Sequence, residues 1–152
     1  MKAEHSVDAV VHDAMVRVRY AETDQMGAVY NSNFFIWFEI GRVELLRSLG
    51  FSYRELESDG YNLPVAEARC RYKAPALYGD TLLIRTRITK LRPSLIAFGY
   101  ETIRQSDGAL LAEGESTHIV VGASKKKVQL PEKYLAPLRR AAGSATRPAA
   151  LR

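Results

Sequence analysis

The chain is poor in the groups that most often build covalent or metal-dependent active sites. Among its 152 residues the single cysteine is Cys70, so neither an intrachain disulfide nor a cysteine-rich metal site is expected. The three histidines, His5, His12 and His118, are scattered and lack the spacing of a ligand set. A Gly-x-Ser-x-Gly elbow, a P-loop and a dinucleotide-binding glycine pattern are all missing. We therefore expect no metal and no separate cofactor.

Long apolar runs are also missing. No stretch approaches the roughly 20 apolar residues of a membrane-spanning helix, so we expect no integral membrane segment. The first residues, MKAEHSVDAVVHDA, contain no continuous apolar core behind a basic segment, which is unlike a signal peptide. By default these features predict a cytoplasmic protein.

The net charge of +5 does not come from the body of the chain. Residues 125–152 hold eight of the 22 Lys and Arg residues and one of the 17 acidic residues, which leaves a net charge of −2 on residues 1–124. Nucleic-acid binding by the body is therefore not expected. We expect residues 1–13 to be a loose lead-in and residues 139–152 to be a mobile, low-complexity basic tail.

One long apolar helix dominates what is present. Its start is indicated by Asn31, Ser32 and Asn33, which are typical of helix N-termini, and its end by Gly50. The apolar side chains between these points cover more than one stripe, so the helix should be wrapped on most sides. Gly41 in its middle predicts a close approach of another element, because glycine costs about 1 kcal/mol there relative to alanine.

Alternating patterns predict strands around this helix. They are expected at residues 15–20, 63–72, 81–91, 95–104 and 109–121, and residues 51–60 are expected to form a short helix or structured loop with Ser52 as its N-cap. This order predicts an α+β fold with one long helix against a five-stranded antiparallel sheet. The small residues Ala97, Gly99, Ala112, Gly114 and Ser116 are expected to leave a groove for the bulky helix.

Asp24 lies shortly before the predicted helix N-terminus. The free N–H groups and positive dipole end of a helix stabilise an oxyanion, so Asp24 could act on a carbonyl held at that point. The alternative is a structural role, because Asp often closes a turn at the entry to a helix.

Two motifs carry a resemblance to a known family. The first spans Tyr20-x-x-Thr23-Asp24-x-Met26-Gly27-x-Val29-Tyr30-x-x-x-Phe34 and continues as Phe38-Glu39-x-Gly41-Arg42; the second is Tyr72-x-x-Pro75-Ala76-x-x-Gly79-Asp80-x-Leu82. Together they resemble the 4-hydroxybenzoyl-CoA thioesterase family, in particular the branch with the Tol-Pal-associated acyl-CoA thioesterases. The resemblance covers about residues 14–122 and implies a hotdog fold assembled as a homodimer or homotetramer, with active sites between subunits.

The resemblance also implies roles for individual residues. Asp24 matches the catalytic carboxylate, which acts as nucleophile on the thioester carbonyl or as general base on water. The backbone N–H of Asn31 would polarise the thioester oxygen, although plain helix capping is also open. Tyr30 would line the acyl pocket or pack in the core. Lys90 and Arg92 would meet the phosphates of CoA or form a solvated turn.

Two further residues admit a catalytic reading. Glu39 lies in the helix where a related thioesterase subfamily carries its catalytic carboxylate, but an ion pair with Arg42 or with an arginine on a strand is favoured. His118 lies in the last predicted strand, where a lone histidine is usually a hydrogen-bonded structural residue. We favour the structural reading of both.

The sequence therefore predicts a single hotdog thioesterase domain over residues 1–138, with its core at residues 14–122. Its expected reaction is hydrolysis of an acyl-CoA thioester to a carboxylic acid and CoA, so that CoA enters as part of the substrate. The alternatives are a hotdog enoyl-thioester hydratase and a non-catalytic module that binds acyl-CoA or an acyl carrier. The aromatic residues of the helix fit either aryl or alkyl acyl groups.

Overall fold

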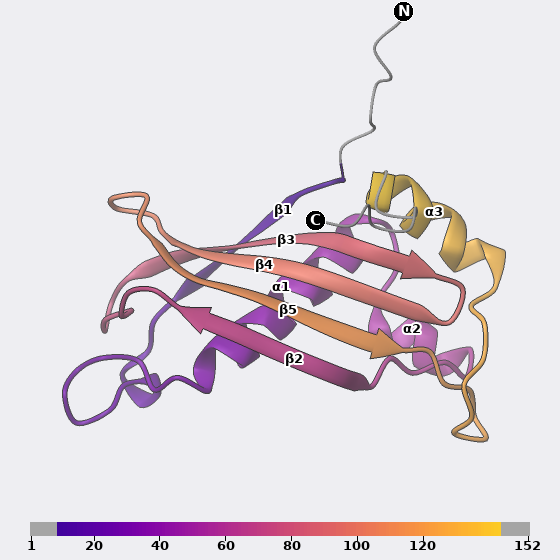
Figure 1. The fold of residues 1–152 in the computed structure, drawn as a ribbon, viewed down its shortest axis with the longest axis horizontal. Helices are drawn as coiled ribbons and strands as arrows, with labels where there is room; N and C mark the ends of the chain where they lie inside the picture. Colours follow the sequence, from indigo (N-terminus) through magenta and orange to yellow (C-terminus); the bar gives the residue numbers. More distant parts are fainter. Residues whose placement is uncertain (1–8, 144–152) are drawn as a thin grey trace, which may run out of the picture.

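Five strands form one antiparallel sheet that wraps around a long helix (Figure 1). The structure, a computed structural model, describes residues 9–143. The helices are α1 (Asn33–Ser48), α2 (Tyr53–Ser58) and α3 (Glu132–Ala142). The strands are β1 (His12–Arg17), β2 (Val65–Tyr72), β3 (Thr81–Arg92), β4 (Leu95–Arg104) and β5 (Leu110–Ile119), in the spatial order β1-β3-β4-β5-β2. This arrangement is the predicted α+β hotdog fold.

The predicted strands are all present, with shifted ends. The largest shift is in β1, which pairs His12 with Thr86 and ends at Arg17, before a 3-10 helix at Tyr20–Glu22. The expectation that residues 1–13 form a loose lead-in is therefore wrong for residues 12 and 13. Asp13 forms an ion pair with Arg85 on the neighbouring strand, 2.9 Å from Oδ1 to Nε.

The predicted close approach at Gly41 is confirmed. A Cβ at this position would collide with Thr86 Oγ1 and lie 2.9 Å from the Ile84 side chain, so only glycine lets α1 sit this near β3. Gly114 on β5 has the same effect, because a Cβ there would collide with the ring of Phe38. The small residues of β5 thus form the expected groove.

The expectation that Ala97 and Gly99 belong to this groove is wrong. Ile96, Phe98 and Tyr100 of β4 pair with His118, Ser116 and Gly114, and these residues face α1. Since neighbours along a strand point to opposite faces, Ala97 and Gly99 lie on the outer face of the sheet. A Cβ on Gly99 would meet Thr89 and Arg87 there.

Helix α3 was not predicted and corrects the expected tail. It runs to Ala142 and buries Tyr134, Leu135, Leu138, Ala141 and Ala142, so residues 139–142 belong to the folded body and the expected boundary after residue 138 falls inside the helix. The carbonyl of Ala141 also accepts a 2.7 Å hydrogen bond from the amide of Val10. Residues 144–152 of the expected tail lie outside the described residues.

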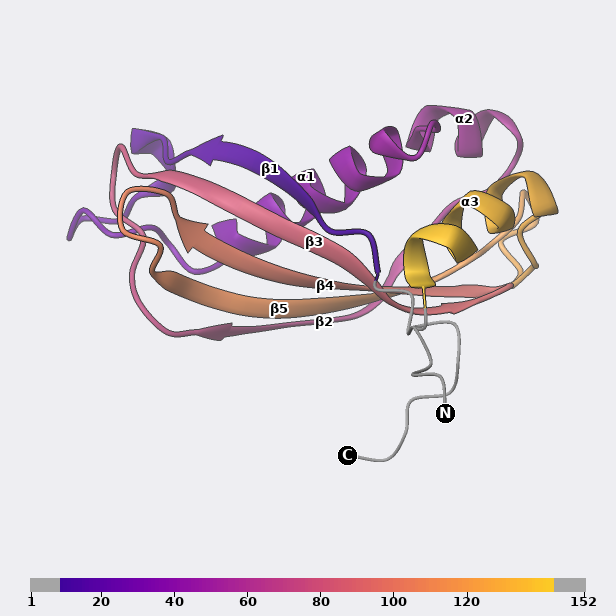
Figure 2. The ribbon, with the colours of Figure 1, turned by 90° about the horizontal axis from the view of Figure 1, so that it is seen from above.

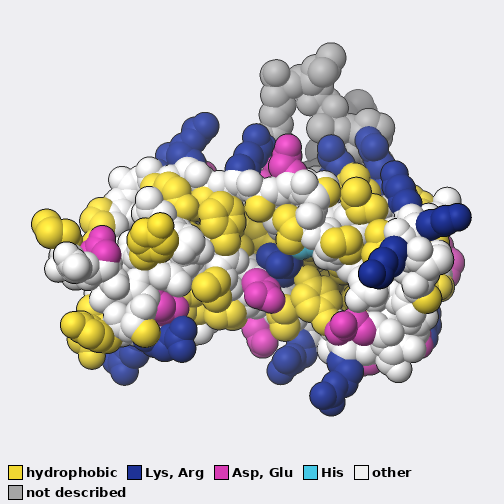
Figure 3. All heavy atoms as spheres, turned by 90° about the horizontal axis from the view of Figure 1, so that it is seen from below, with side chains coloured by type: hydrophobic (Ala, Val, Ile, Leu, Met, Phe, Trp, Pro, Cys, Tyr) yellow, Lys and Arg dark blue, Asp and Glu magenta, His cyan; other side chains and the backbone are white. Residues whose placement is uncertain are grey.

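The helices lie on one side of the sheet, and the described elements leave its other side uncovered (Figure 2). Packing of α1 is strongest against β3 and β1 and much weaker against β2, the strand at the sheet edge. Along that edge hydrophobic side chains form a broken band between charged groups (Figure 3). None of the helices in residues 9–143 is long and apolar enough to cross a membrane.

Candidate active site

Asp24 sits at the tip of a short hairpin between β1 and α1. Thr23 and Val29 form a bridge across the hairpin, and the amide of Asp24 donates to the carbonyl of Ala28 at 2.7 Å. Asp24 Oδ1 accepts from the amides of Met26 at 2.7 Å and Ala28 at 3.3 Å. The carboxylate is exposed, and its second oxygen has no partner within the described part of the chain. The turn predicted as the alternative role is thus present, and it holds a carboxylate with one free oxygen.

Glu22 anchors the base of this hairpin to α1. Its carboxylate is only 5% exposed and accepts from the amide of Arg19 at 2.7 Å and from Trp37 Nε1 at 3.1 Å. Its carbonyl accepts from Asn33 Nδ2 and from the amide of Tyr30, both at 2.9 Å. Because its side-chain and backbone oxygens all accept hydrogen bonds from this region, Glu22 fixes the position of the hairpin relative to the start of α1.

The N-terminus of α1 has amides available to a ligand. The N-cap residue is Ser32, and its side chain makes no capping hydrogen bond. The amides of Asn33, Phe34 and Phe35 donate to the carbonyls of the residues three positions earlier. By contrast, the amides of Asn31 and Ser32 donate to no group in residues 9–143. Unsatisfied N–H groups at a helix N-terminus are suited to stabilise a developing oxyanion.

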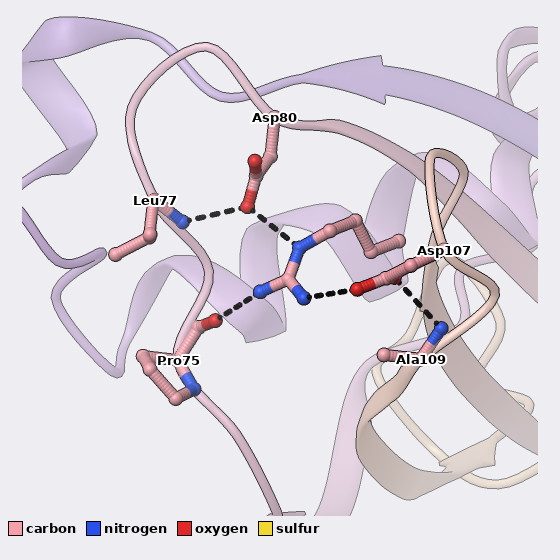
Figure 4. Close-up of polar contacts among 6 residues, drawn as sticks. Pro75, Leu77, Asp80, Asp107 and Ala109 are labelled. Carbon is pink, nitrogen blue, oxygen red and sulfur yellow. Dashed lines mark hydrogen bonds and ion pairs between the residues drawn. The ribbon is translucent and has the colours of Figure 1, made fainter.

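The second motif builds the loop that supports the Asp24 hairpin. The carbonyl of Ala76 accepts from the amide of Val29 at 2.8 Å, and Leu77 forms a bridge with Ala28. This loop, residues 75–80, is held in turn by Arg104 of β4 (Figure 4). Arg104 donates to Asp80 Oδ2 at 3.1 Å, to the carbonyl of Pro75 at 2.9 Å and to Asp107 at 3.0 Å. The amide of Leu77 also donates to Asp80, at 2.9 Å.

Tyr30 is 62% exposed and lies between Asp24 and Asn31 in the hairpin, so core packing, one of its two predicted roles, is wrong. Other large apolar side chains at this end are also exposed, namely Tyr20, Met26, Leu77 and Tyr78. Such a patch marks a surface that a ligand or another protein covers.

Lys90 and Arg92 lie at the opposite end of the molecule from Asp24. β3 begins beside the hairpin, where Asp80 accepts from the amide of Val18, and runs twelve residues to Arg92. At about 3.3 Å per residue this separates the two ends by about 36 Å. Both side chains are exposed. One chain therefore does not bring these cations to Asp24, and their contact with CoA stays a prediction.

The structure distinguishes between the alternative roles predicted for Glu39 and His118. Glu39 is exposed and forms no ion pair within residues 9–143, so the favoured pairing with Arg42 or a strand arginine is wrong. His118 is fully buried, with Nε2 2.8 Å from Ser116 Oγ and Nδ1 3.0 Å from the carbonyl of Leu63. Burial is the largest effect on His118 and lowers its pKa to about 4. Its structural role is confirmed.

The described residues contain no group of three or more His, Cys, Asp or Glu side chains that could hold a metal ion. The chemistry available here is thus that of one oriented carboxylate on a hairpin that leads into free backbone amides.

Comparison with known proteins assigns the chain to a superfamily. Residues 18–138 match the model of the thioesterase-like superfamily. The chain belongs to the thioesterase-like superfamily. This confirms the resemblance at the level of the superfamily; the 4-hydroxybenzoyl-CoA family and its Tol-Pal-associated branch stay predictions.

Individual thioesterase-like relatives agree with this assignment. The chain is 41% identical to the putative acyl-CoA thioesterase YneP of Bacillus subtilis over 70% of this chain and 76% of that protein. It is 34% identical to the acyl-CoA thioester hydrolase YbgC of Escherichia coli over 80% and 90% of the two chains. The crystal structure of a 1,4-dihydroxy-2-naphthoyl-CoA thioesterase from Synechocystis aligns with a TM-score of 0.78 at 26% identity, over 84% of this chain and 95% of that chain.

Proposed function

We propose that this protein is an acyl-CoA thioesterase, in which water cleaves the thioester to a carboxylic acid and CoA. The observation that carries the proposal is the exposed Asp24 carboxylate, held by two backbone amides, on the hairpin that enters α1 at the free amides of Asn31 and Ser32. Its membership of a superfamily with acyl-CoA thioester hydrolases supports the same reaction.

The proposed chemistry uses few groups. Asp24 acts as general base on water or as nucleophile on the carbonyl carbon, and the amides of Asn31 and Ser32 donate to the oxyanion that forms. The leaving thiolate of CoA is stable enough to depart with little acid assistance. We therefore assign no separate general acid.

The active form is proposed to be a homodimer built on β2. This edge strand leaves Val65 51% and Tyr72 41% exposed, and the neighbouring side of α1 exposes Phe35, Ile36 and Ile40. A free strand edge with exposed apolar groups favours pairing with another chain, and a second copy supplies the self-complementary surface for a two-fold contact.

Two-fold pairing of β2 would complete the site. Val65 at the start of β2 lines the pocket that contains Arg42, whereas Tyr72 at its end donates to the carbonyl of Asn31 at 3.0 Å. Antiparallel pairing of β2 with its copy sets Val65 of one protomer near the Tyr72 end of the other. The pocket of one protomer would then face Asp24 and Asn31 of its partner. The same reversal would bring Lys90 and Arg92 of a second copy to the Asp24 end.

A hotdog hydratase is the alternative reaction. In the hydratase reading Asp24 would need a histidine close to it. His118 is buried, engaged through both nitrogens, and placed beside the start of β2 rather than the Asp24 hairpin. Within the described residues this leaves Asp24 without a histidine partner, which favours the thioesterase.

The deciding experiment measures free thiol released from a panel of alkyl- and aryl-CoA thioesters, with enoyl-CoA hydration followed in parallel. The thioesterase proposal expects stoichiometric release of CoA and acid by the wild-type protein. Hydration without thiol release would establish the hydratase instead. Tight acyl-CoA binding without either reaction would establish a non-catalytic module.

A further inference from the structure

A pocket of about 630 Å³ opens between α1, α2 and the segment that leads into β2. It lies near the middle and C-terminal half of α1, away from the Asp24 hairpin of the same chain. Apolar groups of Leu56, Leu63, Pro64 and Val65 form much of its wall. Such a wall can take the methylene groups of an acyl chain.

Arg42 supplies the partly buried charge of this pocket. Its Nε donates to Tyr53 Oη at 3.1 Å and its Nη1 approaches Tyr100 Oη at 3.5 Å. No carboxylate in residues 9–143 lies within ion-pair distance of it. A guanidinium has five N–H groups in a planar fork, so two phenol oxygens leave donors for a further acceptor.

A chain of hydrogen bonds fixes the phenol beneath Arg42. His118 Nδ1 lies 3.0 Å from the carbonyl of Leu63, which makes this nitrogen the donor and leaves Nε2 of the neutral ring as an acceptor. Ser116 Oγ must then donate to Nε2 at 2.8 Å and accept from Tyr100 Oη at 2.5 Å. Tyr100 can therefore only accept from Arg42.

This series of hydrogen bonds holds its side chains in a fixed geometry. Tyr100, Ser116 and His118 are at most 3% exposed. Each has its hydrogen-bond direction set by the next, so the acceptor for Arg42 cannot rotate away. The guanidinium is thus held in place before any ligand arrives, which lowers the entropic cost of binding one.

We propose that the pocket takes the acyl group and that Arg42 binds a carboxylate at its far end, so that acyl-CoAs of dicarboxylic acids are preferred substrates. The inference rests on the proposed thioesterase function. A carboxylate matches the guanidinium fork with two parallel hydrogen bonds, which a neutral acyl end cannot do.

The two carboxylates that line the pocket oppose this only weakly. Glu39 and Glu57 line it but are exposed, as is Lys125. Water screens exposed groups, whereas the partly buried Arg42 interacts through a less polar medium. The guanidinium therefore decides which acyl end the pocket prefers.

The experiment compares kcat/KM for adipoyl-CoA with that for its neutral relatives, methyl adipoyl-CoA and hexanoyl-CoA. The wild-type protein should prefer the free carboxylate by about tenfold or more. Arg42→Met should abolish the preference, and Arg42→Lys should reduce it, because an ammonium cannot make the paired contact. Arg47→Met is the matched control: Arg47 lies on the same helix but is exposed, 3.9 Å from Glu44, and its loss should leave the ratio unchanged.

Each other outcome has a defined meaning. Equal wild-type rates for the three substrates would overturn the inference while leaving the thioesterase intact, and this holds even if Arg42→Met fails to fold. An unchanged ratio in a folded Arg42→Met protein would show that Arg42 is only structural, and a weakened dimer in sedimentation would show that it pairs with the second copy. Absence of hydrolysis of every substrate would instead refute the proposed function.

Discussion

The polar groups that lie near the two ends of the α1 packing surface are in opposite states. At the N-terminus of α1, Asp24 is exposed with one free oxygen, and the amides of Asn31 and Ser32 have no partner among the described residues. Farther along, beside Arg42, the side chains of Tyr100, Ser116 and His118 are buried and joined in one hydrogen-bonded chain. The first region is open for reacting atoms, and the second is closed and rigid. The comparison predicts that substitutions in the first region change turnover and substitutions in the second change stability.

Asp24→Asn should have the largest effect. The amide keeps the shape and can still accept from Met26 and Ala28, but it cannot act as base or nucleophile. We expect kcat to fall on the order of 100-fold or more. The free energy of unfolding should change by no more than about 1 kcal/mol. Steady-state thiol release and chemical denaturation measure the two quantities.

Glu39→Gln tests the other candidate carboxylate, which is also exposed but lies on α1 at the edge of the pocket. It should leave kcat within a few fold. If Glu39→Gln removes activity while Asp24→Asn keeps it, the catalytic carboxylate is Glu39.

Protonation of His118 should destabilise the second region. Its pKa is about 4 in the folded protein against an ordinary value of 6.5. Above pH 6.5 the ring is neutral in both the folded and the unfolded state. Below that pH the unfolded state binds the proton first, so stability falls until about pH 4, by about 3 kcal/mol in total.

The difference between wild type and His118→Gln isolates this contribution. Chemical denaturation of both proteins between pH 4 and 7 should give curves that converge as the pH falls, because glutamine does not titrate. Parallel curves would contradict the assignment of a neutral, buried His118.

Glu22→Ala tests whether every residue of the first region affects turnover rather than stability. Glu22 belongs to this region by its place in the sequence, but its side chain is buried. The change leaves the amide of Arg19 and the indole N–H of Trp37 without their acceptor. Each unsatisfied group costs about 1–3 kcal/mol, so we expect about 2 kcal/mol or more of lost stability in thermal or chemical unfolding. A fully stable variant would show that Glu22 does not anchor the hairpin.

Asn31→Ala should have the smallest effect. The proposed donor is its backbone amide, which the substitution keeps, and its side chain makes no hydrogen bond within residues 9–143. We expect kcat within a few fold of wild type and stability within about 0.5 kcal/mol. A loss comparable to that of Asp24→Asn would assign chemistry to the Asn31 side chain.

Local patterns predicted most of the fold. Alternation located the strands, and Gly41 predicted a close approach of another element, which the structure shows to be β3. Both predictions depend only on neighbouring residues or on one backbone position. The face of Ala97 and Gly99 could not be predicted in the same way, since it depends on which side of β4 meets the helix. Helix α3 was missed for two reasons. Basic residues interrupt its apolar residues, and Pro137, a residue that disfavours a helix interior, lies within it.

The candidate site was predictable only in part. Asp24 was found because it precedes a predicted helix start and matches the catalytic carboxylate of the motif that the chain resembles. Glu22 and Arg104 were missed, since their roles come from Trp37, Pro75 and Asp80, which lie far along the chain. Arg42 looked like an ion-pair partner of Glu39, and only the folded structure shows that its neighbours are phenols.

The central claim is that one protomer supplies Asp24 and the other supplies the pocket, and a mixed dimer tests it most directly. One chain would carry Asp24→Asn. The other would carry Leu63→Trp, which fills the pocket that Leu63 lines. The two chains are co-expressed with different tags, and the heterodimer is purified through both.

Each parent homodimer should be nearly inactive in thiol release. The heterodimer should recover about half of the wild-type kcat, because one of its two sites then combines an intact Asp24 with an intact pocket. An inactive heterodimer would contradict the account, since a site contained within one chain is damaged in both halves. An active Leu63→Trp homodimer would contradict the assignment of the pocket to the acyl group.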